Sequence, residues 1–72
     1  MPLIDVTLLE GVYSSEEKAD LIRELTDALG RVGGAAMREA TSVRIHEIRD
    51  GNWGYAGNVY PVAEAKALKA KG

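Results

Sequence analysis

Cysteine is absent from this 72-residue sequence, and histidine occurs only once. The chain therefore cannot form a disulfide, and it cannot build a zinc site from cysteines or from paired histidines. We expect neither a metal nor a cofactor. A small chain without such supports normally has to self-associate in order to fold stably.

The sequence also lacks an excess of charge of one sign, and it lacks long apolar runs. The formal net charge is -2 with both signs mixed along the chain, so nothing indicates a nucleic-acid partner. No stretch approaches the roughly 20 apolar residues that span a membrane. Residues 1–5 lack the basic and apolar regions of a signal peptide. We expect a soluble, cytoplasmic protein that binds neither nucleic acid nor a membrane.

Hydrophobic residues, by contrast, make up 46% of the chain, which is typical of a globular protein and too high for a disordered one. A domain of this size buries only about 60% of the surface that its unfolded chain exposes, so its own core is marginal. Other copies have to cover the remaining apolar surface. We predict a single domain, residues 1–72, in an obligate homo-oligomer.

The first half of the chain predicts a strand followed by a helix. Residues 2–9 alternate, with apolar residues at positions 4, 6 and 8 and polar residues at 5 and 7, which is the period of a half-buried strand. Ser14 and Glu17 then have the spacing of a capping box. Apolar residues recur at helical spacing through residues 15–32, and Gly33-Gly34 is typical of a helix end.

The second half predicts a partner for the first strand. Residues 41–48 alternate again, and the intervening helix favours parallel pairing of the two strands. The glycine-rich segment 53–57 indicates a short hairpin or an extended loop, and residues 63–69 indicate a short helix or a frayed tail. The expected fold class is α+β or α/β, a single βαβ unit with a short C-terminal hairpin.

In this order and spacing, the segments resemble the 4-oxalocrotonate tautomerase family over nearly the whole chain. The resemblance is carried by Met1-Pro2, Leu9-Glu10-Gly11, Ser15-Glu16-Glu17-Lys18, Leu21-Ile22-Arg23, Thr41-Ser42-Val43-Arg44 and the run from Gly51 to Gly57. It implies a βαβ fold whose dimers assemble into a hexamer. It also implies an isomerase that moves a proton between carbons of a small enol or unsaturated keto acid.

The resemblance implies that Pro2 is the general base once Met1 has been removed. A free α-amino group titrates at about 7.7 to 8.0, and an apolar pocket or a nearby cation lowers that pKa further. A neutral amine near the working pH can then abstract a proton next to a carbonyl. The alternative is that Pro2 only begins the strand.

Arg44 matches the arginine with which the family holds the substrate carboxylate. Its guanidinium can bind that carboxylate and stabilise a developing enolate oxygen, which gives it both a binding and a catalytic role. The alternative is a salt bridge across a subunit interface, to Asp5 or Glu47. Trp53 matches the aromatic residue that lines the family's pocket and keeps it dry, and the alternative is that it fills a subunit interface.

Val12 and Tyr13 depart from the family pattern. Many members carry a second arginine after the Glu-Gly pair, which holds the far carboxylate of a dicarboxylic substrate. Here Val12 and Tyr13 follow Glu10-Gly11, and only the Tyr13 hydroxyl can donate a hydrogen bond. We therefore expect a monocarboxylic substrate with an uncharged tail, unless a neighbouring subunit brings another arginine to the pocket, the candidates being Arg23, Arg31, Arg38 and Arg49.

Two further alternatives remain open. His46 lies on the same strand face as Arg44 and could tune it or Pro2, although a lone histidine is more often an ordinary surface residue. The chain could also be a non-catalytic family member, such as the partner in a mixed hexamer or a small-ligand binding module. The two functions differ in whether Pro2 has a free amine, because only the enzyme requires one.

Overall fold

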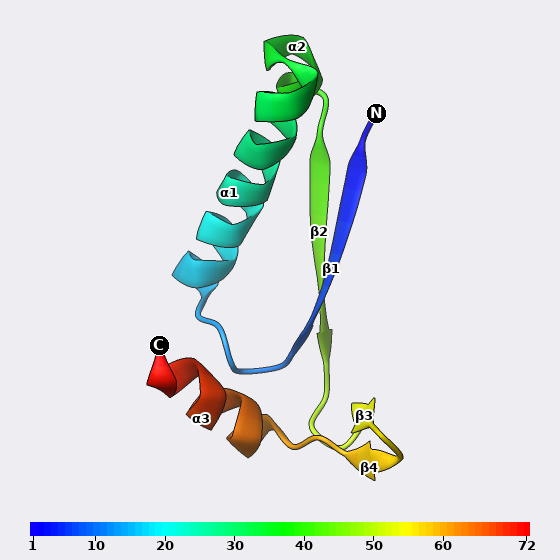
Figure 1. Cartoon of the computed structure of the whole chain (residues 1–72), viewed down its shortest axis with the longest axis vertical. Helices are drawn as coiled ribbons and strands as arrows, with labels where there is room; N and C mark the ends of the chain where they lie inside the picture. The colour runs from blue at the N-terminus through cyan, green and yellow to red at the C-terminus, as the bar shows by residue number, and fades with distance from the viewer.

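The computed structural model describes all 72 residues and has the expected βαβ unit followed by a short hairpin (Figure 1). Its elements are β1 (Leu3–Leu9), α1 (Ser15–Gly33), α2 (Ala35–Glu39), β2 (Ser42–Ile48), β3 (Gly54–Tyr55), β4 (Asn58–Val59) and α3 (Val62–Lys71). The prediction of two strands, a long connecting helix and a hairpin is confirmed. The one-turn helix α2 was not expected, and α3 is a regular helix of 10 residues rather than a frayed tail.

Strands β1 and β2 pair in parallel, with Leu3 opposite Ser42 and Leu9 opposite Ile48. Along β1 the residues alternate between exposed and half-buried positions, as the period of two predicts. Helix α1 lies along one side of the two strands (Figure 1). Lys18 of α1 reaches this side of β2, where its Nζ lies 3.1 Å from a carboxylate oxygen of Glu47. The opposite face of the two strands has no helix over it.

The ends of α1 follow from specific residues. Ser14 Oγ accepts a hydrogen bond from the Glu17 N–H, and Glu17 Oε1 accepts one from the Ser14 N–H, so the predicted capping box is present. Gly34 ends the helix with φ 99°, a conformation that favours glycine. The chain then forms α2, which an ion pair of 2.7 Å between Arg38 and Asp27 fastens to α1.

The hairpin is closed by a two-residue turn, Ala56-Gly57, between β3 and β4. Both turn residues have positive φ, 51° for Ala56 and 82° for Gly57, as a type I′ turn requires. A further hydrogen bond of 2.7 Å from the Tyr60 N–H to the Trp53 carbonyl holds the base of the hairpin together. The two aromatic residues are thereby fixed side by side.

A single chain has almost no core of its own. Leu9, which is 6% exposed, is the one buried residue, and the molecule measures 42 × 24 × 18 Å. Its radius of gyration is 14.6 Å, whereas a compact domain of this length would have about 11 Å. None of the helices is long and apolar enough to cross a membrane.

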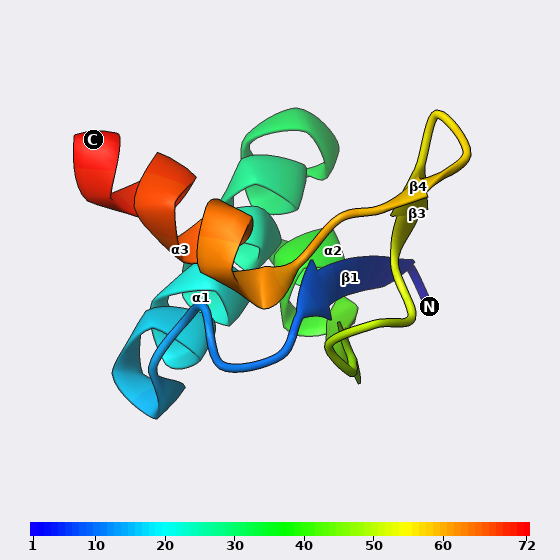
Figure 2. The ribbon, with the colours of Figure 1, turned by 90° about the horizontal axis from the view of Figure 1, so that it is seen from below.

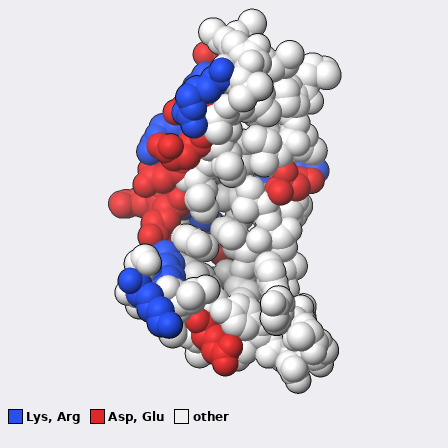
Figure 3. All heavy atoms as spheres, in the orientation of Figure 1, with Lys and Arg blue, Asp and Glu red and all other residues white.

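Charge is unevenly distributed over this elongated shape. Figure 3 shows acidic and basic side chains gathered along the outer side of α1, while the surface over the strands is mostly uncharged. The strand surface carries one spot of mixed charge. An uncharged face on a chain with so small a core is a surface on which other copies can pack.

Candidate active site

An apolar hollow of about 220 Å³ lies where the strands end. Residues from four parts of the chain line it: the end of β1, the β1–α1 loop, the two residues that flank the hairpin, and α3. The lining residues are Thr7, Leu8, Leu9, Val12, Tyr13, Trp53, Tyr60, Ala65, Leu68 and Lys69. Most of them are hydrophobic, so the hollow can hold an uncharged group and exclude water from it.

The loop after β1 brings Val12 and Tyr13 into the hollow. Gly11 turns the chain with φ 75°, a conformation that glycine adopts without strain. Both Val12 and Tyr13 are half-buried. No arginine of the same chain lines the hollow.

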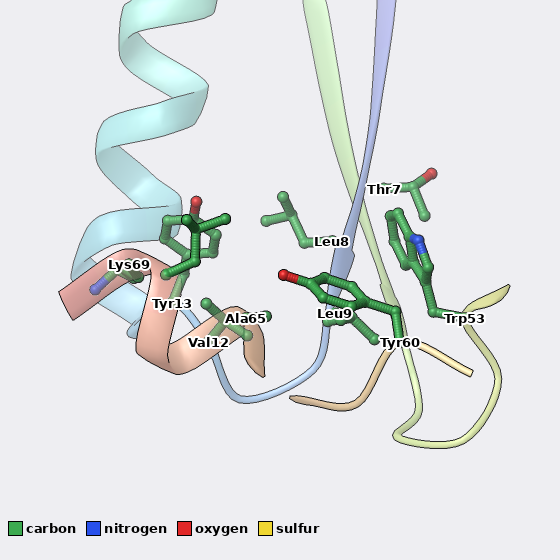
Figure 4. Close-up of a pocket in the computed structure, with 10 residues that line it drawn as sticks. Thr7, Leu8, Leu9, Val12, Tyr13, Trp53, Tyr60, Ala65 and Lys69 are labelled. Carbon is green, nitrogen blue, oxygen red and sulfur yellow. The ribbon is translucent and has the colours of Figure 1, made fainter. Parts of the chain in front are cut away.

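The hairpin supplies the aromatic side of the hollow. Trp53 and Tyr60 are both half-buried, and Figure 4 shows both of them near the end of β1. The same two residues and Tyr55 also line an adjoining hollow of about 300 Å³. Tyr60 was not anticipated from the sequence, although its place just before Pro61, at the end of the glycine-rich segment, would have pointed to the base of a hairpin.

Helix α3 supplies the remaining side, and its contribution also went unpredicted. Ala65, Leu68 and Lys69 follow one another at helical spacing, so one face of α3 meets the hollow. Figure 4 shows Lys69 beside Tyr13, on the side of the hollow away from Trp53. The sequence of residues 63–69 indicated only a short helix or a frayed tail, so it gave no reason to expect that this segment lines a pocket.

Pro2 stands at the opposite end of β1 from the hollow. Five residues of extended strand separate it from Thr7, which corresponds to about 16 Å. The Pro2 carbonyl accepts a hydrogen bond of 2.9 Å from the Ser42 N–H, which fixes the start of the strand. With Met1 in place, the Pro2 nitrogen is an amide, and the Met1 ammonium instead donates a hydrogen bond of 2.6 Å to the Ala40 carbonyl.

Arg44 lies on the open face of the strands, where it meets Asp5. Arg44 Nε and His46 Nε2 lie 3.2 Å and 3.3 Å from the same Asp5 oxygen. Hydrogen bonds to the Asp5 carboxyl, chiefly from Arg44 and to a smaller extent from His46, hold its pKa below its usual range. Arg44 thus pairs with Asp5 within one chain, whereas the alternative considered for it was a salt bridge across a subunit interface. Glu47, the other partner considered, pairs with Lys18. The Arg44 side chain remains 60% exposed.

The structure therefore brings together only part of the predicted site. Val12, Tyr13 and Trp53 line one hollow, whereas Pro2 and Arg44 of the same chain lie outside it. The hollow offers apolar and aromatic contacts but neither a base nor a free cation.

Comparison with known proteins places this architecture in a family. The sequence model of a family described as "Tautomerase enzyme" matches residues 2–62. A probable tautomerase of Ralstonia nicotianae is 49% identical over 57 residues, which cover 79% of this chain and 79% of the relative. A probable tautomerase of Staphylococcus aureus is 42% identical over 57 residues, which cover 79% of this chain and 90% of the relative.

Solved structures agree with the sequence relatives. TomN, a 4-oxalocrotonate tautomerase homologue of the tomaymycin biosynthetic pathway, superposes with a TM-score of 0.73 at 41% identity. The match covers 92% of this chain and 95% of TomN. The fold is thus that of the small βαβ tautomerases. The chain belongs to the tautomerase enzyme family, and its relatives support an isomerase activity in general terms.

Proposed function

We propose that the protein is a tautomerase that moves a proton within a small monocarboxylic enol or keto acid, with Pro2 as the base after loss of Met1. The observation that carries the proposal is the apolar, aromatic hollow at the strand ends, which lies in a chain of the tautomerase family and lacks a base of its own. A secondary amine is the group that this hollow needs to complete a proton-transfer site.

Each site is completed by a second copy of the chain in this proposal. Pro2 cannot reach the hollow of its own chain, because about 16 Å of strand lies between them. A chain with a single buried residue and an open strand face must pack against other copies. We therefore place the Pro2 amine of one copy over the hollow of another copy in a homo-oligomer. The family resemblance implies that this homo-oligomer is a hexamer.

Arg44 binds the substrate carboxylate and stabilises the enolate oxygen in this assembly. Its Nε is occupied by Asp5, but the two terminal nitrogens of the guanidinium make no ion pair within the chain. Those two nitrogens offer the planar pair of donors that a carboxylate accepts. Asp5 then orients the guanidinium, and the uncharged tail of the substrate enters the hollow beside Val12 and Trp53.

The reaction needs no group other than these. The Pro2 amine removes a proton from the enol oxygen or from the carbon next to the carbonyl and returns it to the other position. Negative charge that develops on the oxygen meets the Arg44 guanidinium. Trp53 and the other apolar residues keep water away, which strengthens that interaction.

The test is an ultraviolet assay of enol ketonisation with protein whose intact mass shows that Met1 is absent. Pro2→Ala keeps a primary amine but changes its basicity and geometry, so we expect kcat/KM to fall by about tenfold or more. The circular dichroism spectrum should stay unchanged. Unchanged turnover by fully processed Pro2→Ala would place the base elsewhere, and absence of turnover by processed wild type would favour the non-catalytic alternative.

A further inference from the structure

We infer that α3 is the specificity wall of the pocket, that Lys69 fixes this wall in place, and that the wall selects an aromatic, uncharged substrate tail. The inference rests on the proposed function for the reaction but not for the binding. The α3 residues that line the hollow, Ala65, Leu68 and Lys69, lie beyond the matched family segment, which ends at residue 62.

Helix α3 is attached to the rest of the chain at both ends. At its start, the Val62 N–H donates a hydrogen bond of 3.0 Å to a carboxylate oxygen of Asp50. Near its end, Lys69 Nζ lies 2.8 Å from Glu17 Oε2 and 5.3 Å from the centre of the Tyr13 ring. A cation over a tyrosine face is an attractive arrangement, so Lys69 holds α3 against both α1 and the β1–α1 loop. Figure 2 shows α3 beside the first turns of α1, away from the hairpin.

Lys69 holds α3 in position and does not serve as a second anchor for a substrate carboxylate. Its ammonium already has a carboxylate partner, and Lys69 lowers the pKa of Glu17, which keeps that partner ionised. The pair is therefore neutral. A substrate carboxylate at this end would have to compete with Glu17, which the capping box also fixes. The wall thus disfavours a charged tail even though a lysine lines it.

The size and lining of the hollow favour an aromatic tail. Its volume is about 220 Å³, and an engineered apolar cavity of about 150 Å³ is known to hold benzene. The rings of Tyr13, Trp53 and Tyr60 offer faces and edges against which a further ring can pack. Ala65 leaves room for this ring on the α3 side, where a larger side chain would fill it.

Binding can be measured without turnover because Trp53, the only tryptophan, lines the hollow. We would titrate its fluorescence with 3-phenylpropionate and with butanoate, and take the ratio of the two dissociation constants. Wild type should bind the aromatic acid about tenfold more tightly or better, as burial of a ring predicts. Lys69→Met keeps the apolar stem but loses the charge, and Lys71→Met is the matched control on the same helix.

We expect Lys69→Met to reduce the ratio by about threefold or more, because an unfastened wall packs less closely on a ring. Ala65→Leu should reduce it at least as much by filling the space, and Lys71→Met should leave it unchanged. If the circular dichroism spectrum shows that Lys69→Met perturbs the fold, the ratio measured for Ala65→Leu is the test of the inference. An unchanged ratio in both test variants, or no preference for the aromatic acid in wild type, would overturn the inference.

The outcome is separable from that of the proposed function. If wild type is inactive but prefers the aromatic acid, and Ala65→Leu and Lys69→Met reduce that preference, the tautomerase proposal is overturned and the inference about α3 is supported. An active wild type whose preference does not depend on Ala65 or Lys69 would do the reverse.

Discussion

At the scale of single residues, the account depends on which charges meet the substrate. Arg44 offers its terminal nitrogens on the open strand face, and the only cation that lines the hollow is Lys69, which Glu17 already neutralises. Arg23 and Arg38, two of the arginines considered as replacements, pair with Asp20 and Asp27 of the same chain. In the proposed site, the far end of the substrate therefore meets Val12 and aromatic rings.

Val12→Arg should consequently broaden the substrate range. A far carboxylate now loses its hydration without gaining a partner, which costs on the order of 1–3 kcal/mol. We expect wild type to turn over 2-hydroxymuconate roughly tenfold to a hundredfold less efficiently than a phenylpyruvate-type enol. Val12→Arg should recover part of that loss.

The matched control is Arg44→Ala, which should reduce kcat/KM for both substrates to a similar extent because both carry the carboxylate that Arg44 holds. Ultraviolet assays on the two substrates measure all of these values. Equal turnover of both substrates by wild type would mean that an arginine from a neighbouring copy serves the far carboxylate.

At the scale of elements, local chemistry in the sequence was sufficient for much of the fold. The period of two gave β1 and β2, and the Ser14–Glu17 spacing gave the start of α1, because these signals depend on neighbouring residues alone. Helix α2 was not predicted because the five residues after Gly34 are too few to show a helical period. The role of α3 in lining the hollow was not predicted, because it depends on contacts with Asp50, Glu17 and Tyr13, which are far from α3 in sequence.

The contact between α1 and α3 should make stability depend on pH. Lys69 lowers the pKa of Glu17 below its ordinary value of 4.5, so near this pH the folded chain binds fewer protons than the unfolded chain. The stabilising contribution is therefore complete above pH 4.5 and is lost as the pH falls through the folded-state pKa. Asp5 contributes with the same sign from its own, lower ordinary value.

Thermal unfolding between pH 6 and pH 3 measures this dependence. In Lys69→Met the pKa of Glu17 returns toward its ordinary value, so the fall in Tm with acid should be smaller than in wild type. Lys71→Met should follow the wild-type curve. Parallel curves for all three proteins would show that the Glu17–Lys69 pair does not persist in solution.

At the scale of the whole molecule, the dominant feature is the lack of a core within one chain. The sequence predicted this from length, hydrophobic content and the absence of cysteine, and the structure has a single buried residue. The separation of Pro2 from the hollow could not be predicted, because the resemblance named the site residues without saying which chain supplies each. The distance along β1 makes assembly a requirement of the proposed chemistry as well as of stability.

We expect a homo-oligomer, with the hexamer as the predicted state. Sedimentation velocity at low micromolar concentration should give one species several times the mass of the 7.7 kDa chain. The open strand face and the uncharged surface beside it are the areas expected to be covered. A stable, folded monomer at that concentration would contradict both the assembly and the shared site.

The central claim is that one copy supplies Pro2 and another supplies the hollow, and a mixing experiment tests it most directly. Pro2→Ala lacks the base but keeps the hollow, while Val12→Glu keeps the base but places a carboxylate where the substrate binds. Each variant alone should be nearly inactive. After unfolding and joint refolding at equal concentrations, random assembly leaves about a quarter of the sites with both parts intact. We predict recovery of about a quarter of the wild-type ketonisation rate, whereas a mixture that stays as inactive as its components would contradict the shared site.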